Sequence, residues 1–136
     1  MTATRLAAVF AAACLLAGCS LRSGGDGGPT DEGYTLLQDV NDLLRAAAGA
    51  TGRPPSKFAD LNPHQATFPR AHAAIKSGSV VVVWGTPLKG EGEAGRDDAV
   101  VAYQKDVPTE GGYVLLAAGE VKKMTPSEFQ SAPKAK

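Results

Sequence analysis

The chain has little of what enzyme chemistry usually requires. It contains two cysteines, Cys14 and Cys19, and two histidines, His64 and His72. Basic and acidic residues balance at fourteen each, and aromatic residues make up only 6% of the chain. No segment holds five like charges in a row, so the basic surface typical of nucleic-acid-binding proteins is missing. We therefore expect no nucleic-acid partner.

Long hydrophobic runs are also missing. Arg5 precedes an apolar stretch at residues 6–16, which is too short for a transmembrane helix of about 20 residues. A positive charge, a short apolar segment and small residues before a possible cleavage site are typical of an export signal. The segment ends in Leu16-Ala17-Gly18-Cys19.

This ending resembles a bacterial lipobox. The resemblance implies that residues 1–18 are removed, that the Cys19 sulfur carries a diacylglycerol, and that the new amine is acylated, for example by palmitate. Two or more acyl chains anchor a protein stably, because each buried methylene contributes about 0.8 kcal/mol. Two alternatives stay open: a secretory signal cut elsewhere, which would leave Cys19 as a free thiol, and an uncleaved membrane anchor.

Cleavage would have two further consequences. Cys14 would be lost, so the mature chain would have no thiol for a disulfide, a metal or a nucleophile, although it lies in an oxidising compartment. Loss of Arg5 would leave thirteen basic against fourteen acidic residues, a net charge near −1. Ser20 in place of Asp after the lipidated cysteine resembles an outer-membrane sorting pattern. We expect an exported, lipid-anchored envelope protein on the periplasmic side, with the outer membrane favoured.

The remaining chain is long enough for one domain. Residues 20–33 read SLRSGGDGGPTDEG, a composition that builds no core and is typical of a flexible linker. We predict a lipidated tether at 19–33, one small domain at 34–130 and a disordered tail at 131–136.

The first part of this domain has helical periodicity. Apolar residues recur at the spacings i, i+4, i+7 and i+11, and the set is Leu36, Leu37, Val40, Leu43, Leu44, Ala47 and Ala48. This predicts an amphipathic helix over 34–48, ended by Gly49, Gly52 and Pro54-Pro55. Ser56 is a candidate N-cap for a short helical turn over 58–61. Residues 68–76 fit a strand or a helical turn, and we favour the turn.

The second half favours strands. Residues 79–84 are Ser79 followed by a continuous apolar run to Trp84, which predicts a strand covered on both faces. Further strands are predicted at 98–105, 112–117 and 120–124, the last with lysines that protect an exposed edge. Gly119 predicts a bulged turn with positive φ, and Thr125, Pro126 and Glu128 predict a terminal helical turn with a capping box.

Together these elements predict an α+β fold. One amphipathic helix would pack across a three- or four-stranded antiparallel meander, and the second face of the sheet would be partly wet. Trp84, at the end of the first strand, would pack in the core, with a partner-facing role as the alternative.

The junction at Leu43-Leu44, Gly52-Arg53-Pro54-Pro55 and Leu61 resembles the helix-to-sheet junction of type II secretion pseudopilins. The closing segment, residues 113–121 followed by 125–129, is similar to the last hairpin of pilin-like proteins. The resemblance covers roughly residues 36–130 and implies a pilin-like globular head. Pilins also carry a prepilin cleavage site and a long apolar stem helix. Here the lipobox and the predicted tether stand in their place, so the resemblance implies no filament.

Polar and charged residues are concentrated in one loop, PLKGEGEAGRDD at 87–98. Glu91, Glu93, Asp97 and Asp98 are oxygen ligands of the kind that Ca²⁺ prefers, and some pseudopilins bind calcium in a loop of the sheet region. Against this, Lys89 and Arg96 offset the charge, and a solvated loop is the simpler interpretation. His64 and His72 have no cysteine or carboxylate spacing typical of zinc, so we expect both on the surface.

Three functional hypotheses follow. The first, which we favour, is a lipoprotein without catalytic or cofactor residues that binds an envelope protein of unknown identity. The second is a small-ligand or calcium-binding module that uses the 87–98 loop. The third, an enzyme, lacks any set of nucleophile, base and orienting residue.

Overall fold

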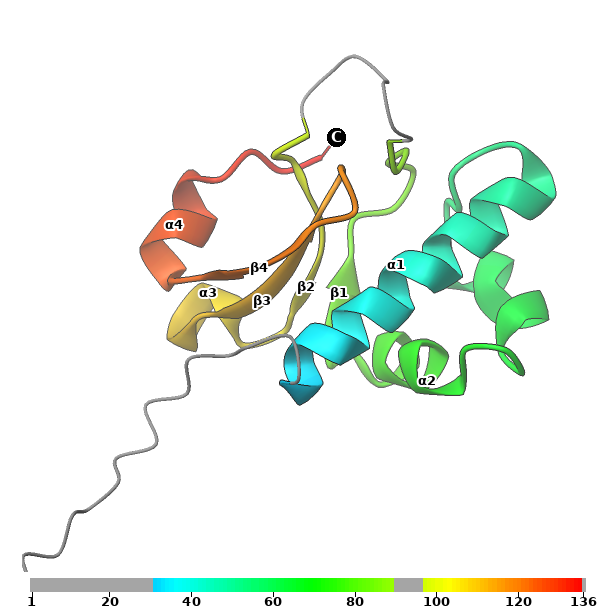
Figure 1. The fold of residues 1–136 in the computed structure, drawn as a ribbon, viewed down its shortest axis with the longest axis horizontal. Helices are drawn as coiled ribbons and strands as arrows, with labels where there is room; N and C mark the ends of the chain where they lie inside the picture. The colour runs from blue at the N-terminus through cyan, green and yellow to red at the C-terminus, as the bar shows by residue number, and fades with distance from the viewer. Residues whose placement is uncertain (1–30, 90–96, 136) are drawn as a thin grey trace, which may run out of the picture.

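The computed structural model describes residues 31–89 and 97–135. Its elements in chain order are α1 (Glu32–Thr51), η1 (Phe58–His64), α2 (Pro69–Ser77), β1 (Val80–Val82), β2 (Val100–Gln104), α3 (Val107–Glu110), β3 (Gly112–Leu116), β4 (Val121–Met124) and α4 (Pro126–Ser131). The strands form one antiparallel sheet in the order β1-β2-β3-β4, and α1 lies across one face (Figure 1). The predicted α+β fold, a long helix packed on an antiparallel meander, is confirmed.

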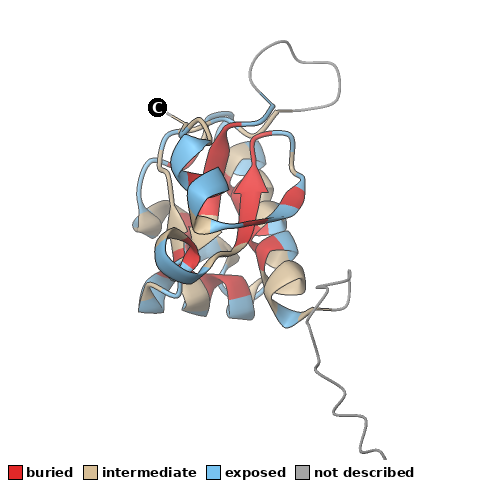
Figure 2. Cartoon of the chain, turned by 90° about the vertical axis from the view of Figure 1, so that its left-hand side faces the viewer, coloured by how far each residue is buried: buried red, intermediate tan, exposed pale blue. Residues whose placement is uncertain are grey.

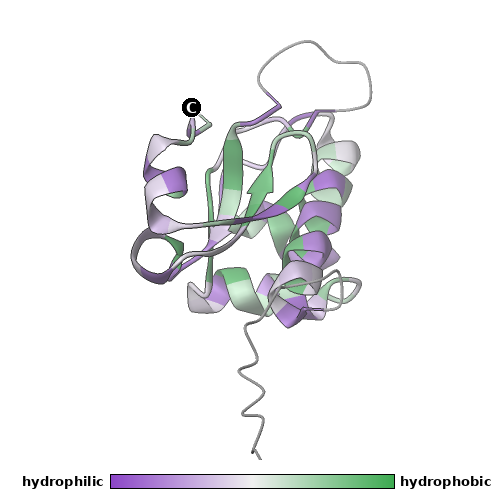
Figure 3. Cartoon of the chain, turned by 60° about the vertical axis from the view of Figure 1, so that its left-hand side comes forward, coloured by the Kyte–Doolittle hydropathy of each residue, from purple (hydrophilic) through white to green (hydrophobic). Residues whose placement is uncertain are grey.

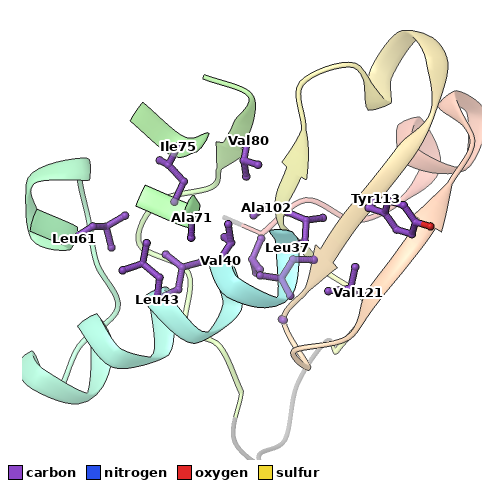
Figure 4. Packing of buried hydrophobic residues seen from close by; sticks show 14 of the residues in the cluster. Leu37, Val40, Leu43, Leu61, Ala71, Ile75, Val80, Ala102, Tyr113 and Val121 are labelled. Carbon is purple, nitrogen blue, oxygen red and sulfur yellow. The ribbon is translucent and has the colours of Figure 1, made fainter. Parts of the chain in front are cut away.

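Helix α1 buries the apolar stripe that its periodicity predicts. Five of its residues are buried against the sheet, η1 and α2, namely Leu37, Val40, Leu43, Leu44 and Ala47. Figure 4 shows several of these side chains pointing into one packed cluster. The helix starts at Glu32, earlier than the predicted position 34, and Asp31 caps it by accepting a hydrogen bond from the Gly33 N–H. It ends before Gly52, whose φ of +68° is favourable for glycine.

Side chains along the strands alternate between the two faces of the sheet, and both faces carry apolar clusters. Along β3, Tyr113 and Leu115 point to the cluster under α1, and Val114 and Leu116 belong to a second cluster on the other side. The pairing of β2 with β3 contains an irregularity between Val100 and Ala102. The predicted turn between β3 and β4 is present, with Gly119 at φ +86°.

The second face of the sheet differs from the expectation of a partly wet surface. A buried cluster lies there, made of Val100, Val107, Val114, Leu116, Met124 and Phe129. Its covering side chains come from α3 and α4, which lie on the side of the sheet opposite α1 (Figure 1). The central strands β2 and β3 are therefore mostly buried and the outer helix faces are exposed, as Figure 2 shows. Figure 3 shows the strongest hydrophobic colouring on the central strands, whereas β4 carries the hydrophilic residues Lys122 and Lys123.

A strand is present within residues 79–84, as predicted, but it is shorter than expected and is not fully covered along its length. Strand β1 has three residues, and of these only Val80 is buried. It pairs on one side only, with β2, and so lies at the edge of the sheet. The chain then turns at Gly85, whose N–H donates to the Pro55 carbonyl. Trp84 is partly buried and packs against the cluster under α1, as its predicted core role requires.

Two helices lie where the sequence fitted both a strand and a helical turn or where it predicted no element. Helix α2, Pro69–Ser77, covers nearly all of residues 68–76, which confirms the favoured helical turn. The short helix α3 was not predicted, and its Val107 is fully buried in the cluster on the second face. Within residues 31–89 and 97–135, no helix combines the length and apolar character needed to cross a membrane.

The predicted disordered tail differs over its described part. Lys134 forms a parallel bridge with Val100 of β2. The Val100 N–H donates to the Pro133 carbonyl at 2.9 Å, and the Ala135 N–H donates to the Val100 carbonyl at 3.2 Å. These bonds form beyond the end of β1, where that side of β2 is free to pair. Residues 133–135 thus complete the sheet edge, and Lys136 lies outside the described residues.

The capping box of α4 is confirmed and predicts a pH dependence. The Thr125 N–H donates to Glu128 Oε2 at 2.7 Å, and the Thr125 hydroxyl donates to the same oxygen at 3.0 Å. These bonds hold the pKa of Glu128 below its usual value in the folded state. The stabilisation is therefore present above the unfolded pKa of about 4.3 and is lost as the pH falls through the lower folded pKa.

Urea unfolding at neutral and acid pH tests this dependence. We expect Glu128→Gln to lower the stability at pH 7, with the difference from the parent chain shrinking at pH 3. Thr125→Ala should cost about 1 kcal/mol at pH 7, the usual effect of losing an N-cap. Glu110→Gln, at an exposed position, is the matched control. A stability difference for Glu128→Gln that is equal at both pH values would contradict the prediction.

Candidate functional site

The predicted site residues divide between described and undescribed parts of the chain. Cys19, the proposed lipid attachment site, and the calcium candidates Glu91 and Glu93 lie outside the described residues. Asp97 and Asp98 lie just before β2, and both are exposed. Asp97 Oδ1 is 3.4 Å from Lys89 Nζ, so a cation at Asp97 would compete with a lysine already there. In the part of the chain that the structure describes, no three potential metal ligands come together.

The two histidines occupy different environments. His64 is partly buried at the end of η1. His72 was expected on the surface and is instead buried, with 4% of its area exposed. Its Nε2 lies 3.1 Å from Asn62 Oδ1, and its ring packs on Phe58 with centroids 4.7 Å apart. A hydrogen bond and an aromatic neighbour account for this residue as part of the packing between α2 and η1.

A polar cluster forms where the predicted tether meets the domain. Asp31 bonds the start of α1 through one oxygen and accepts a hydrogen bond from the Tyr113 hydroxyl at 3.1 Å through the other. The Tyr113 N–H in turn donates to Gln104 Oε1 at 2.8 Å. Burial, together with the bond to the Asp31 carboxylate, raises the pKa of Tyr113 above its usual value. Figure 4 shows Tyr113 at the opposite end of the packed cluster from Leu61, with its hydroxyl pointing away from it.

This cluster holds the first turn of α1 against the sheet. Tyr34 adds an edge-on ring contact to Tyr113, with centroids 6.1 Å apart. Gly33 allows the close approach: a Cβ there would lie 2.7 Å from Gln104 Nε2 and 2.8 Å from Tyr113 Cδ2. The hydrogen bonds between Asp31, Gly33 and Tyr113 and the bond from Tyr113 to Gln104 join the start of α1 to the sheet, so the role of the cluster is to fix the entry of the chain into the fold.

Alanine substitutions at two glycines of α1 should change the free energy of unfolding in opposite directions. Gly33→Ala should lower the free energy of unfolding by about 1–3 kcal/mol, because the buried Tyr113 ring must shift to admit the methyl group. Gly49→Ala, where the added atom meets nothing within 4 Å, should raise it by about 0.5–1 kcal/mol. Urea unfolding of the two variants measures both effects. Equal effects of the two substitutions would show that the first turn of α1 is not held as described.

A second set of polar atoms lies at the other end of the sheet. Thr86 and Lys89 contribute to the wall of a cavity of about 370 Å³ next to residues 133–135, but the atoms Thr86 Oγ1 and Lys89 Nζ are themselves buried and closed to solvent. Sequence reasoning treated Lys89 only as a charge that offsets the 87–98 loop, and it did not single out Thr86, Asp31 or Tyr113. Asp31 had a usable signal, an N-cap residue type before an apolar periodic segment. The cavity had none, because it depends on distant segments meeting.

The comparisons with known proteins add no relative. No family model matches the chain, and neither the curated proteins nor the solved structures gave a match.

Proposed function

We propose that the chain is a lipid-anchored envelope protein whose domain acts by contact with another envelope component. The observation that carries the proposal is the sequence Leu16-Ala17-Gly18-Cys19 after a short apolar stretch. Eleven residues, 20–30, separate Cys19 from Asp31, the cap of the first helix. Lipid on Cys19 would therefore attach the domain through a short connection that enters it at one defined point.

The packing of the domain supports this arrangement. Both faces of the sheet are covered by the chain's own helices, so its apolar side chains serve its own core. Membrane attachment is then the task of the acyl chains, and two or more of them suffice without a membrane-binding surface on the protein.

A pilin-like head without a filament stem is the fold analogy that we propose for this domain. The long helix α1 precedes an antiparallel meander and packs across it, the arrangement that the resemblance to pseudopilins implies. The analogy concerns architecture, and function does not follow from fold. It supports a structural or interaction role on the periplasmic side, with the outer membrane favoured by Ser20.

The calcium-binding alternative gains no support from the described residues. Of its four candidate ligands, Asp97 is paired with Lys89, and Asp98 also has an interaction partner. We retain the non-catalytic anchored protein as the proposal. Membrane partitioning and intact mass of a Cys19→Ser variant, compared with the parent chain, test it.

A further inference from the structure

The edge of β2 at Val100 is covered by another segment of the same chain. The chain leaves this edge after Val83, whose N–H donates to the Val101 carbonyl at 2.8 Å. Val100 is fully buried, and its N–H and carbonyl pair with the Pro133 carbonyl and the Ala135 N–H at 2.9 and 3.2 Å. Because a buried backbone group that is left unpaired costs free energy, this edge requires an extended segment beside it.

The covering segment, residues 133–135, has a limited hold on the sheet. It runs parallel to β2, with Lys134 opposite Val100, and two backbone hydrogen bonds join it to that residue. The Lys134 ammonium group donates to the carbonyls of Phe129 and Ala132 and lies 4.0 Å from the centroid of the Phe129 ring. These contacts fasten the segment to the end of α4 instead of to the strand. A segment held by few contacts can open while the rest of a domain stays folded.

The covering segment also leaves space beside it. Residues 133–135 form one wall of the cavity of about 370 Å³, and Ala99 and Ala117 form part of another. Ala135 packs partly against the cluster under α1, to which Ala99 and Ala117 belong. A longer aliphatic side chain at the position of Ala135 would therefore occupy apolar space that the alanine leaves open.

We propose that the edge of β2 at Val100 binds an extended peptide segment of an envelope protein, which displaces residues 133–135. Addition of a strand to a sheet edge is a recurring mode of peptide recognition. The covering segment defines the partner's chemistry. It runs parallel to β2, offers Val100 a carbonyl and, two residues later, an N–H, and carries an aliphatic side chain at the position of Ala135.

This site rests on the proposed envelope contact for the existence of a partner, but not on the lipid anchor. Binding of a peptide by the purified protein tests the site, whereas Cys19→Ser tests the anchor. Either can therefore fail while the other stands.

Hydrogen exchange at two amides measures whether the covering segment opens. The Val100 N–H is bonded to Pro133, and the Ala117 N–H donates to the Ala99 carbonyl inside the sheet. In the full chain, purified in detergent micelles, the Val100 amide should exchange at least about tenfold faster than the Ala117 amide after correction for intrinsic rates, because local opening is enough. Equal protection of the two amides would show that the segment leaves β2 only on unfolding, which would overturn the proposal.

A peptide that copies residues 130–135 with the change Ala135→Leu is the binding probe. NMR follows the Val100 amide of the full chain during the titration, and we expect a saturable shift. The probe should bind at least about tenfold more tightly than the unchanged peptide, because leucine buries more apolar area. The matched control peptide carries Ala135→Pro and should not bind, because proline lacks the N–H that pairs with the Val100 carbonyl.

The same two substitutions in the chain should change binding in opposite directions. Ala135→Leu strengthens the chain's own segment, so the Val100 amide should exchange more slowly and the probe should bind about three- to tenfold more weakly. Ala135→Pro weakens that segment, which competes at an effective concentration of about 1 mM, so the probe should bind about three- to tenfold more tightly. Melting curves check that both variants are folded.

Three results of these titrations would overturn the proposal. Equal binding of the leucine and proline peptides would exclude pairing with the Val100 backbone. No binding of the leucine peptide to the Ala135→Pro chain, in which the competing segment is weakened, would show that the edge accepts no partner. A concentration-dependent dimer of the parent chain, with the Val100 signal changing as it forms, would show that residues 133–135 of a second copy occupy the edge instead.

Discussion

Replacing Cys19 by serine is expected to abolish lipid attachment. In the parent chain, removal of residues 1–18 and acylation of Cys19 should give a protein that is heavier than residues 19–136 and partitions into detergent phase. Serine has no thiol to accept the diacylglycerol, so intact mass spectrometry of Cys19→Ser should show no acyl mass. Two or more acyl chains make anchoring effectively stable, whereas the bare domain has no such anchor, so the change in partitioning should be close to complete once the signal is removed.

Cys14 provides the matched control for this experiment. It lies in the segment predicted to be removed, so Cys14→Ser should leave the mass and the partitioning of the mature protein unchanged. The lipid assignment is wrong if Cys19→Ser stays with membranes and its measured mass exceeds the mass of its sequence by the same amount as in the parent chain. A parent protein whose mass shows cleavage elsewhere and a free thiol would select the plain secretory signal instead.

Truncating Leu43 should have the largest effect on folding. The residue is fully buried in α1, and Figure 4 shows its side chain within the cluster that also contains Val40 and Leu61. Leu43→Ala should lower the free energy of unfolding by about 2–5 kcal/mol, through lost burial and the cavity left behind. Small domains have only about 5–15 kcal/mol in total, so this loss is a large part of the stability.

Asp42→Ala is the control for this variant. Asp42 is the neighbouring residue of the same helix and is exposed, so its substitution should change the stability by no more than about 0.5 kcal/mol. Urea unfolding followed by circular dichroism measures both variants. Similar small effects at the two positions would contradict the burial of the α1 stripe.

The features predicted well are those set by neighbours in sequence. The stripe of α1 follows from a spacing of three and four residues, and the capping box at Thr125 and Glu128 follows from a four-residue pattern. The turn at Gly119 follows from the residue type that positive φ requires. Each of these signals is complete within a short segment, and tertiary packing agrees with it in the structure.

The features missed depend on contacts between distant segments. His72 lies on a short helix whose burial is decided by η1 and α1, and the continuous apolar run at 79–84 did not indicate that β1 is an edge strand. The apolar character of Val107 and Phe129 gave no sign that α3 and α4 would cover the second face together. Residues 133–135 are Pro-Lys-Ala, a sequence that does not predict a strand, and only the free side of β2 explains why they pair.

The candidate site residues also differ in whether a local pattern or distant contacts define them. Cys19 is predicted as the lipid attachment site from a local motif, whereas the cavity at Thr86 and Lys89 needs four segments of the chain to meet. A lysine in a charged loop is usually solvated, so neither the residue type nor its neighbours indicated burial.

The two ends of the described chain lie at opposite ends of the sheet. The N-terminus of α1 lies beside Gln104 and Tyr113, whereas residues 133–135 lie beside Val100, at the other end of β2. An anchor upstream of Asp31 would therefore hold the Tyr113 end nearest the lipid surface. The end of the sheet at residues 133–135 would then lie away from the point of attachment.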